Sequence, residues 1–422
     1  MRWALSLAAL LLAAGCSASP PAAGPPAAPP PAPADGFDVG RFTLGVLADL
    51  SGPAADADRA ALAGVQAYWA GVNARGGVAG LYPVELSVSD HDAAGSEAGA
   101  AAAVLEGWDI AALAYLSPAI DAAELTGELP VPAVPAVATL AGEDLGWVLT
   151  WTSPVELTTV GLLDRFRASG PGATWCIIVD RSPPGRQVAA AAYAAGAARE
   201  TVPAVLDLEV GEIEVLDLDA SVFDVTDAVE DRRCRHVLVE AAEPTAIHVL
   251  DRLPANLTVV RRSTLAAGRE LPEGVELLID AAPPWSAGGS EVMDAFAADW
   301  TKFNAEAPAD ARARAGWLSQ LRLHLLLEQA VAAGDVSRER LVALAPRVEP
   351  VDPNRNTLPG VPRVGMDISE PVAGGPVRTL RLYGRSEVGA DRLGLRQVLV
   401  LDLTSFAEGL RERLGASDPF DS

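Results

Sequence analysis

Hydrophobic and polar positions follow two recurring patterns along most of the chain. Short runs of apolar and β-branched residues have the length of buried strands, and the alanine-rich segments between them carry apolar residues at helical spacing. Leu62, Val65, Trp69 and Val72 are spaced so that they share one face of a helix. The alternation predicts an α/β fold in which helices flank parallel sheets.

The pattern predicts two doubly wound lobes. Ser153-Pro154-Val155-Glu156 has the form of a capping box with proline at the first helical position, so we expect a helix to begin there and to open the second lobe. In the first lobe we expect strands at 42–50, 84–90, 110–115 and 133–139, and helices at 96–106 and before 129. In the second we expect strands at 173–180, 205–216, 236–240, 257–260 and 275–280.

The last part of the chain returns to both lobes. Long helices are expected at 291–305 and 311–333 and should pack on the first lobe, whereas strands at 379–383 and 397–403 should extend the second. A loop should join them at 349–362. The expected organisation is a signal peptide at 1–16, a Pro/Ala-rich linker at 17–40, a first lobe at 41–152 plus 285–350, and a second lobe at 153–284 plus 363–422.

The N-terminal segment has the features of an export signal. Arg2 precedes a run of Ala and Leu that is too short to cross a bilayer comfortably, and small residues follow up to Cys16. The ending Leu-Ala-Ala-Gly-Cys resembles the lipobox of bacterial lipoproteins, which implies that Cys16 is lipidated; the alternative is a plain cleaved signal. We therefore expect an extracytoplasmic protein that a lipid anchor holds at the membrane.

Composition and charge exclude several functions. With 32 Lys and Arg against 56 Asp and Glu the formal net charge is −24, so nucleic acid is not an expected partner. The sequence contains no P-loop, Gly-x-Ser-x-Gly elbow or Gly-x-Gly-x-x-Gly motif. Asp90-His91-Asp92 is the nearest approach to a metal motif, yet the four histidines are scattered and none has a second ligand at metal spacing. We expect neither catalysis, nor a cofactor, nor a metal.

Two cysteines remain in the predicted folded region. Cys176 opens one apolar strand and Cys234 lies just before another. If these strands are parallel neighbours, the two sulfur atoms lie at the same sheet edge within bridging distance. The alternatives are a disulfide and two unrelated buried thiols.

The first 100 residues of the folded region resemble the leucine/isoleucine/valine-binding family, the type I periplasmic binding proteins of ABC importers. The resemblance is carried by Ser51-Gly52-Pro53, the segment Asn73-Ala74-Arg75-Gly76-Gly77-Val78 at the expected distance, and the strand that follows at 84–90. It implies two lobes joined by three crossovers that close on a small ligand at the carboxyl ends of the strands. Open parallel sheets bind ligands at that place on general grounds as well.

The resemblance also implies ligand-binding residues. Ser117 stands where the family offers donors to a ligand carboxylate, and Ala138-Thr139 matches an Ala-Thr pair that contacts the same group. The structural alternatives are that Ser117 is only an N-cap and Thr139 only a strand-end hydroxyl.

Three further residues are candidates for the ligand site. Asp180 and Glu240 each end a second-lobe strand, so either could offer a carboxylate to a cationic ligand group, the alternative being a solvated loop acid. Tyr115 either packs on the ligand or closes the core. The segment Val260-Arg261-Arg262-Ser263-Thr264 has no clear equivalent of the family's ammonium-binding acid.

The expected function is that of a monomeric, lipid-anchored solute-binding protein that delivers a small polar ligand, amino-acid-like or amide-like, to an ABC permease. The first alternative is a sensor or orphan receptor of the same fold. The second is a surface enzyme.

Overall fold

The computed structural model describes fourteen parts of the 422-residue chain: 31–52, 54–91, 108–118, 130–166, 174–197, 213–217, 225–241, 243–254, 256–262, 275–279, 291–304, 309–349, 379–385 and 395–414. The expected signal peptide with Cys16, the helix at 96–106, the helix expected before 129 and almost all of the loop at 349–362 lie outside these residues. The other expected elements lie within them, some only in part.

The first sheet is built around its longest strand, β2. It has the order β1-β2-β4-β5, and β3 pairs with β2 as well. All its pairings are parallel except that of β1 with β2. Its strands are β1 (Phe37–Asp38), β2 (Arg41–Ala48), β3 (Val84–Asp90), β4 (Ala112–Tyr115) and β5 (Ala133–Pro135).

Strand β1 lies in the stretch that we expected to be linker. Phe37 is buried, and its ring lies 4.8 Å from that of Phe42 and 5.3 Å from that of Tyr82, measured between ring centroids. An aromatic contact of this kind holds the short strand on the sheet. The first lobe therefore extends further toward the N-terminus than the expected boundary at residue 41.

The second sheet is parallel in its centre and antiparallel at one edge. Its order is β12-β11-β10-β9-β8-β6-β7, and the late strands β11 and β12, which extend the sheet as expected, run antiparallel to their neighbours. The strands are β6 (Thr174–Val179), β7 (Ile213–Asp217), β8 (Cys234–Glu240), β9 (Thr258–Arg262), β10 (Val275–Ile279), β11 (Thr379–Arg385) and β12 (Leu395–Asp402).

Helices cover both sheets, as the alternation predicts. The first sheet is accompanied by α1 (Ala55–Ala74), α9 (Glu291–Phe303), α10 (Ala311–Ala333), α11 (Arg338–Leu344) and the short 3-10 helix η3 (Ala345–Arg347), which share one hydrophobic core with it. The second is accompanied by α5 (Val155–Phe166), α6 (Pro183–Ala197), α7 (Val225–Asp231), α8 (Glu243–Leu250) and α12 (Thr404–Leu414). The long late helices thus return to the first lobe.

Helices α1 and α10 approach each other at two glycines. A Cβ atom at Gly64 would lie 1.9 Å from the carbonyl oxygen of Ala313, and one at Gly316 would lie 2.0 Å from that of Ala61. Only glycine fits where two backbones come this close. The crossing fixes α10 against the first sheet.

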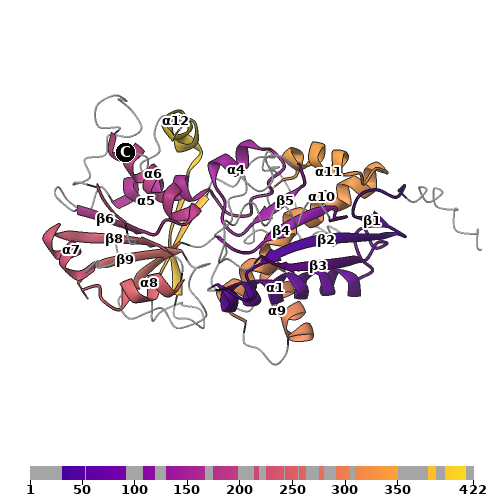
Figure 1. Cartoon of the computed structure of the whole chain (residues 1–422), viewed down its shortest axis with the longest axis horizontal. Coiled ribbons are helices and arrows are strands. Elements are labelled where there is room, and N and C mark those ends of the chain that lie inside the picture. Colours follow the sequence, from indigo (N-terminus) through magenta and orange to yellow (C-terminus); the bar gives the residue numbers. More distant parts are fainter. Residues whose placement is uncertain are drawn as a thin grey trace, which may run out of the picture.

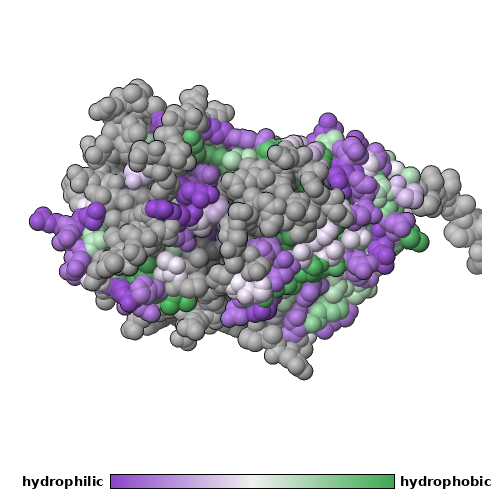
Figure 2. Space-filling view, viewed as in Figure 1, coloured by the Kyte–Doolittle hydropathy of each residue, from purple (hydrophilic) through white to green (hydrophobic). Residues whose placement is uncertain are grey.

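The two lobes lie side by side and the chain passes between them three times (Figure 1). The passages run from β5 to α5, from β10 to α9 and from η3 to β11. On the face shown in Figure 2, hydrophilic side chains gather around α7 and around α11. Within the described parts of the chain, no helix combines the length and the hydrophobicity that crossing a membrane requires.

A disulfide joins Cys176 of β6 to Cys234 of β8, with 5.8 Å between the two Cα atoms. The two strands are parallel neighbours, and Thr174 lies opposite Cys234. Of the two alternatives that the sequence left open, the structure has the disulfide.

Candidate functional site

The carboxyl ends of the two sheets meet around the first turn of α5. Val155 at the start of α5 donates its backbone N–H to the carbonyl of Ala138, which follows β5 of the first sheet (2.9 Å). Thr158, one turn later, accepts a hydrogen bond from Arg262, the last residue of β9 in the second sheet (3.2 Å). One helix start therefore contacts a candidate residue of the first lobe, Ala138, and a strand-end arginine of the second, Arg262.

Thr139 caps a short helix that the sequence pattern did not reveal. Strand β5 ends at Pro135, four residues earlier than expected, and α4 (Leu140–Asp144) follows. The Thr139 hydroxyl accepts the backbone N–H of Gly142 at 3.1 Å. It thereby satisfies one of the first N–H groups of α4, which have no partner within the helix. As an acceptor in this bond, the hydroxyl keeps its own proton for donation to another group.

Glu156 connects the two helix starts. The capping box predicts that its carboxylate turns back to Ser153. In the structure Oε1 accepts the backbone N–H of Leu140, the first residue of α4, at 3.0 Å. Glu156 is buried, and a carboxylate at a helix N-terminus is favoured by the helix dipole. Leu140 itself packs into the hydrophobic core of the second lobe. Helix α4 thus spans the boundary between the lobes.

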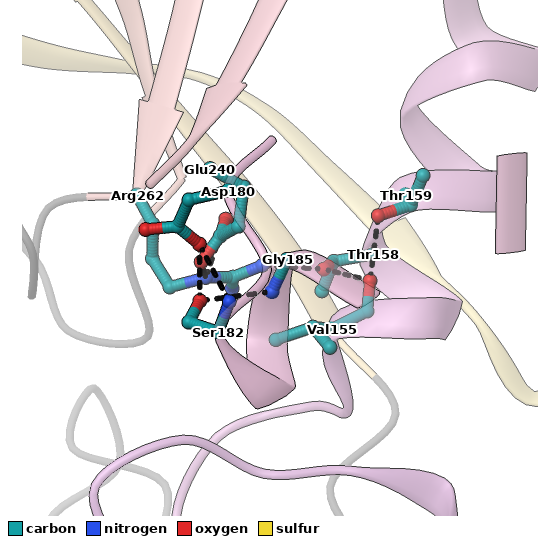
Figure 3. A network of polar contacts seen from close by, with 8 residues as sticks. All are labelled: Val155, Thr158, Thr159, Asp180, Ser182, Gly185, Glu240 and Arg262. Atoms are coloured by element: carbon teal, nitrogen blue, oxygen red, sulfur yellow. Dashed lines mark hydrogen bonds and ion pairs between the residues drawn. The ribbon is translucent and has the colours of Figure 1, made fainter. Parts of the chain in front are cut away.

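Glu240 is held by a buried arginine (Figure 3). The Arg262 Nε lies 3.3 Å from Glu240 Oε2 and 3.4 Å from Oε1, and the Arg262 Nη2 donates to Thr158. Both charged side chains are less than a tenth exposed. A buried carboxylate needs such a partner. The structure therefore gives Glu240 a role that the sequence did not show, as one member of an ion pair across neighbouring strand ends.

Asp180 organises the turn that leads into α6 (Figure 3). Its Oδ1 accepts the backbone N–H of Ser182 at 3.1 Å, and the Ser182 hydroxyl also donates to it. A Cβ at Gly185 would lie 2.1 Å from the Asp180 carbonyl oxygen. Gly185 is thus required by the close turn, and Asp180 is a buried turn acid, not a solvated one.

The remaining candidates lie on the first sheet and are buried. Tyr115 belongs to a compact hydrophobic cluster with Leu47 and Leu113, which agrees with the alternative that it closes the core. Ser117 is fully buried just beyond β4, and the helix expected to follow it lies outside the described residues. Ala138 contributes its backbone carbonyl to the start of α5.

A second acidic residue pair at the end of β2 was missed by the sequence reasoning. Asp49 is fully buried, and its carboxylate accepts the backbone N–H of Gly52 at 2.5 Å and that of Ala54 at 2.8 Å, so it supports the chain at the start of α1. Its own N–H donates to the carboxylate of Asp58, also at 2.8 Å. The signal available in the sequence was an acid two residues before Ser51 and another in the first turn of the next helix.

Burial raises the pKa of Asp58 from 3.8 to about 7, and the nearby Asp49 carboxylate adds to the shift, whereas the Asp49 N–H and Arg312 oppose it. The folded protein holds the Asp58 proton more tightly than the unfolded chain does. The protonated carboxyl therefore makes its full contribution to the free energy of unfolding below pH 3.8, and this contribution is lost as the pH rises through about 7. Asparagine mimics the protonated acid. We expect D58N to exceed the wild type in unfolding free energy by roughly 2 kcal/mol at pH 8 and to match it near pH 4.

Urea unfolding at several pH values measures this difference. D56N is the matched control, since Asp56 lies in the same helical turn with a fully exposed side chain. A constant difference between D58N and wild type from pH 4 to 8 would contradict the raised pKa.

Among the described residues, no group of three His, Cys, Asp or Glu side chains is placed to hold a metal ion. Asp90 is engaged differently: its Oδ1 accepts the backbone N–H of Leu50 at 2.9 Å. The carboxylate therefore supports the turn after β2.

The comparisons with known proteins agree with this architecture. The family model described as periplasmic binding protein matches residues 41–360 of the chain. Among curated proteins none matches significantly. Many solved structures do match.

Three of these structures illustrate the likeness. The fatty acid ABC transporter substrate-binding protein from Thermomonospora curvata has a TM-score of 0.66 and 16% identity, over 92% of this chain and 97% of that one. A solute-binding protein from R. palustris in complex with 4-hydroxybenzoate has a TM-score of 0.64 and 16% identity, over 86% of this chain and 97% of that one. A leucine-binding protein from Thermotoga maritima has a TM-score of 0.61 and 13% identity, over 85% of this chain and 98% of that one. Such identities show the fold, and together with the family match over three quarters of the sequence they show that this chain belongs to the periplasmic binding proteins, extracytoplasmic receptors that bind solutes and are not enzymes.

Proposed function

We propose that the protein is the lipid-anchored solute receptor of an ABC importer, and that it holds a small polar ligand between the two lobes at the carboxyl ends of their sheets. The ligand would contact Ser117 and Thr139 from the first lobe and the turn around Asp180 and Glu240 from the second. Closure of the lobes would bring the two halves of this site together. A permease would then accept the ligand without any chemical step.

The observation that carries the proposal is the meeting of both strand ends at α5. Polar groups at the carboxyl ends of parallel strands are the usual place for a ligand in this class of fold. Here the first turn of α5 contacts Ala138 on one side and Arg262 on the other. A ligand beside this helix start would touch both lobes at once.

The ligand class needs an open search. The similar structures named above are described with fatty acid, 4-hydroxybenzoate and leucine. We favour an amino-acid-like or amide-like molecule, because the donors expected at Ser117 and Thr139 suit a carboxylate or amide oxygen. A thermal-shift screen against amino acids, amides, small peptides, aromatic acids and fatty acids will identify binders, since a ligand of the folded state raises the melting temperature.

Thr139→Ala should weaken the affinity for a ligand found in this way about tenfold or more, the cost of losing a hydrogen bond to a polar ligand group. Ser117→Ala should act in the same direction. Isothermal titration calorimetry separates this loss from the stability that the missing N-cap costs.

Thr226→Ala is the control for the calorimetry. It is the same substitution on α7, where the Thr226 hydroxyl donates to the carbonyl of Arg252, away from α5. Unchanged affinity in both T139A and S117A would place the ligand elsewhere. Mass spectrometry of the mature N-terminus tests the lipid anchor at Cys16 separately.

A sensor of the same fold is the second candidate. It is favoured by the engagement of Glu240 with Arg262 and of Asp180 with Ser182, because these acids are already committed within the protein. Co-purification of the membrane-bound protein with a permease would decide for the importer, and co-purification with a signalling protein would decide for the sensor.

A further inference from the structure

Two of the connections between the lobes leave the first lobe beside one buried arginine. Thr150 lies between α4 and α5, near the end of the stretch that leads from β5 to α5, and Val348 follows η3 on the way to β11. Arg322 of α10 lies between them. These two points are far apart in sequence but share a single side chain.

The guanidinium group of Arg322 bonds to both chains through their backbone carbonyls. Nη1 donates to the carbonyl of Thr150 at 3.1 Å, while Nε and Nη2 donate to that of Val348 at 3.1 and 2.9 Å. The donors of a guanidinium are fixed in one plane, so three bonds to two carbonyls also set the distance between these carbonyls. A lysine has no such fork.

The chain on the first-lobe side of each contact is firmly attached. Leu149 donates its N–H to Ala133 of β5 at 2.7 Å, one residue before Thr150. Val348 is fully buried in the first-lobe core and donates its N–H to Ala345 of η3. The backbone is therefore fixed up to these residues, and Trp151, which follows Thr150, still packs in the first-lobe core. The two carbonyls that Arg322 holds lie close to where the fixed part of each connection ends.

Burying the charge of Arg322 costs free energy. Its side chain is almost fully buried, and burial lowers the pKa of Arg322 from 12.5 to about 10, so the group is still charged at neutral pH. The three bonds go to neutral carbonyls, so they do not form an ion pair. Packing alone would be served as well by an apolar residue of similar volume.

We propose that Arg322 is a positioning residue of the interlobe hinge: it holds two pivot points, the carbonyls of Thr150 and Val348, at one spacing, so that the second lobe moves against the first about a defined axis. The proposal rests on lobe closure as the proposed function uses it, but not on the identity of the ligand. Hinges of this kind are a few residues at element ends that absorb the backbone rotation.

The test measures the distance between the lobes in the ligand-free protein. Nitroxide labels at L81C and Y193C, both exposed positions, report one distance across the lobes by double electron–electron resonance. C16S is included in every variant, and the disulfide keeps Cys176 and Cys234 from reacting. In R322K and R322M we expect the distance distribution to broaden by roughly half or more, because the two pivots are no longer held together.

The control is R338K. Arg338 of α11 donates to the carbonyl of Ile110 at 3.0 Å, a contact within the first lobe, so the same substitution should leave the distribution unchanged. If R322M does not fold, R322K carries the test. A distribution of wild-type width and mean in the R322 variants, even with a lowered melting temperature, would make Arg322 an ordinary structural residue. Failure to find a ligand would refute the proposed function without altering these distances.

Discussion

Replacing Arg262 with methionine should lower the free energy of unfolding by about 3–5 kcal/mol, the cost of leaving a buried charge without its partner. Glu240 is 1% exposed and has Arg262 within 3.4 Å through both carboxylate oxygens, so water does not replace the lost cation readily. The Thr158 hydroxyl loses a donor in the same change. Urea unfolding followed by circular dichroism measures the loss.

The double variant E240L/R262M separates the ion pair from the packing around it. When both charges are removed, no uncompensated group is left, and the stability should return to within about 1 kcal/mol of the wild type. R41M is the matched control, because Arg41 pairs with Glu85 at 2.9 Å with both side chains about half exposed. Exposed pairs contribute about 0–1 kcal/mol. A loss in R262M no larger than that in R41M would show that water reaches Glu240.

The ion pair of Glu240 and Arg262 shows which part of the site could be predicted from the sequence. Strands β8 and β9 were both expected, and their register places Val239 opposite Arg261, which puts Glu240 next to Arg262. Opposite charges at the ends of two adjacent parallel strands are readable once that adjacency is known. Strand adjacency is a tertiary property. For this reason the sequence suggested Glu240 as a ligand group and left Arg262 unassigned.

The hydrophobic pattern predicted the long helices and strands correctly but missed a short helix. The expected helix at 311–333 and the strand at 84–90 coincide with α10 and β3. Helix α4, in contrast, has five residues, and Thr139 reads equally well as the end of a strand. The partner of Glu156 could not be read either, because Leu140 is brought to it by the meeting of the lobes. The turn at 51–53 and the segment at 73–78 carried the family resemblance, and the family match confirms it.

Reducing the disulfide should destabilise the second lobe by about 4 kcal/mol, because opening a loop of 58 residues restores chain entropy to the unfolded state. Cys176 and Cys234 lie near the amino ends of β6 and β8, while Asp180 and Glu240 lie at or just after the carboxyl ends of the same two strands. The bond therefore joins the strands at the end opposite to the candidate site. Urea unfolding with and without dithiothreitol measures the effect.

The C176A/C234A variant provides the control for this measurement, since dithiothreitol should leave its unfolding midpoint unchanged. The variant should also keep the ligand affinity within about twofold at temperatures where it stays folded, because the parallel pairing that places Val179 opposite Glu240 is held by backbone hydrogen bonds and by the hydrophobic cores on both faces of the sheet. Equal midpoints of the wild type in oxidised and reduced form would contradict the stabilising role. A large loss of affinity in the folded variant would show instead that the disulfide sets the geometry of the carboxyl ends of β6 and β8.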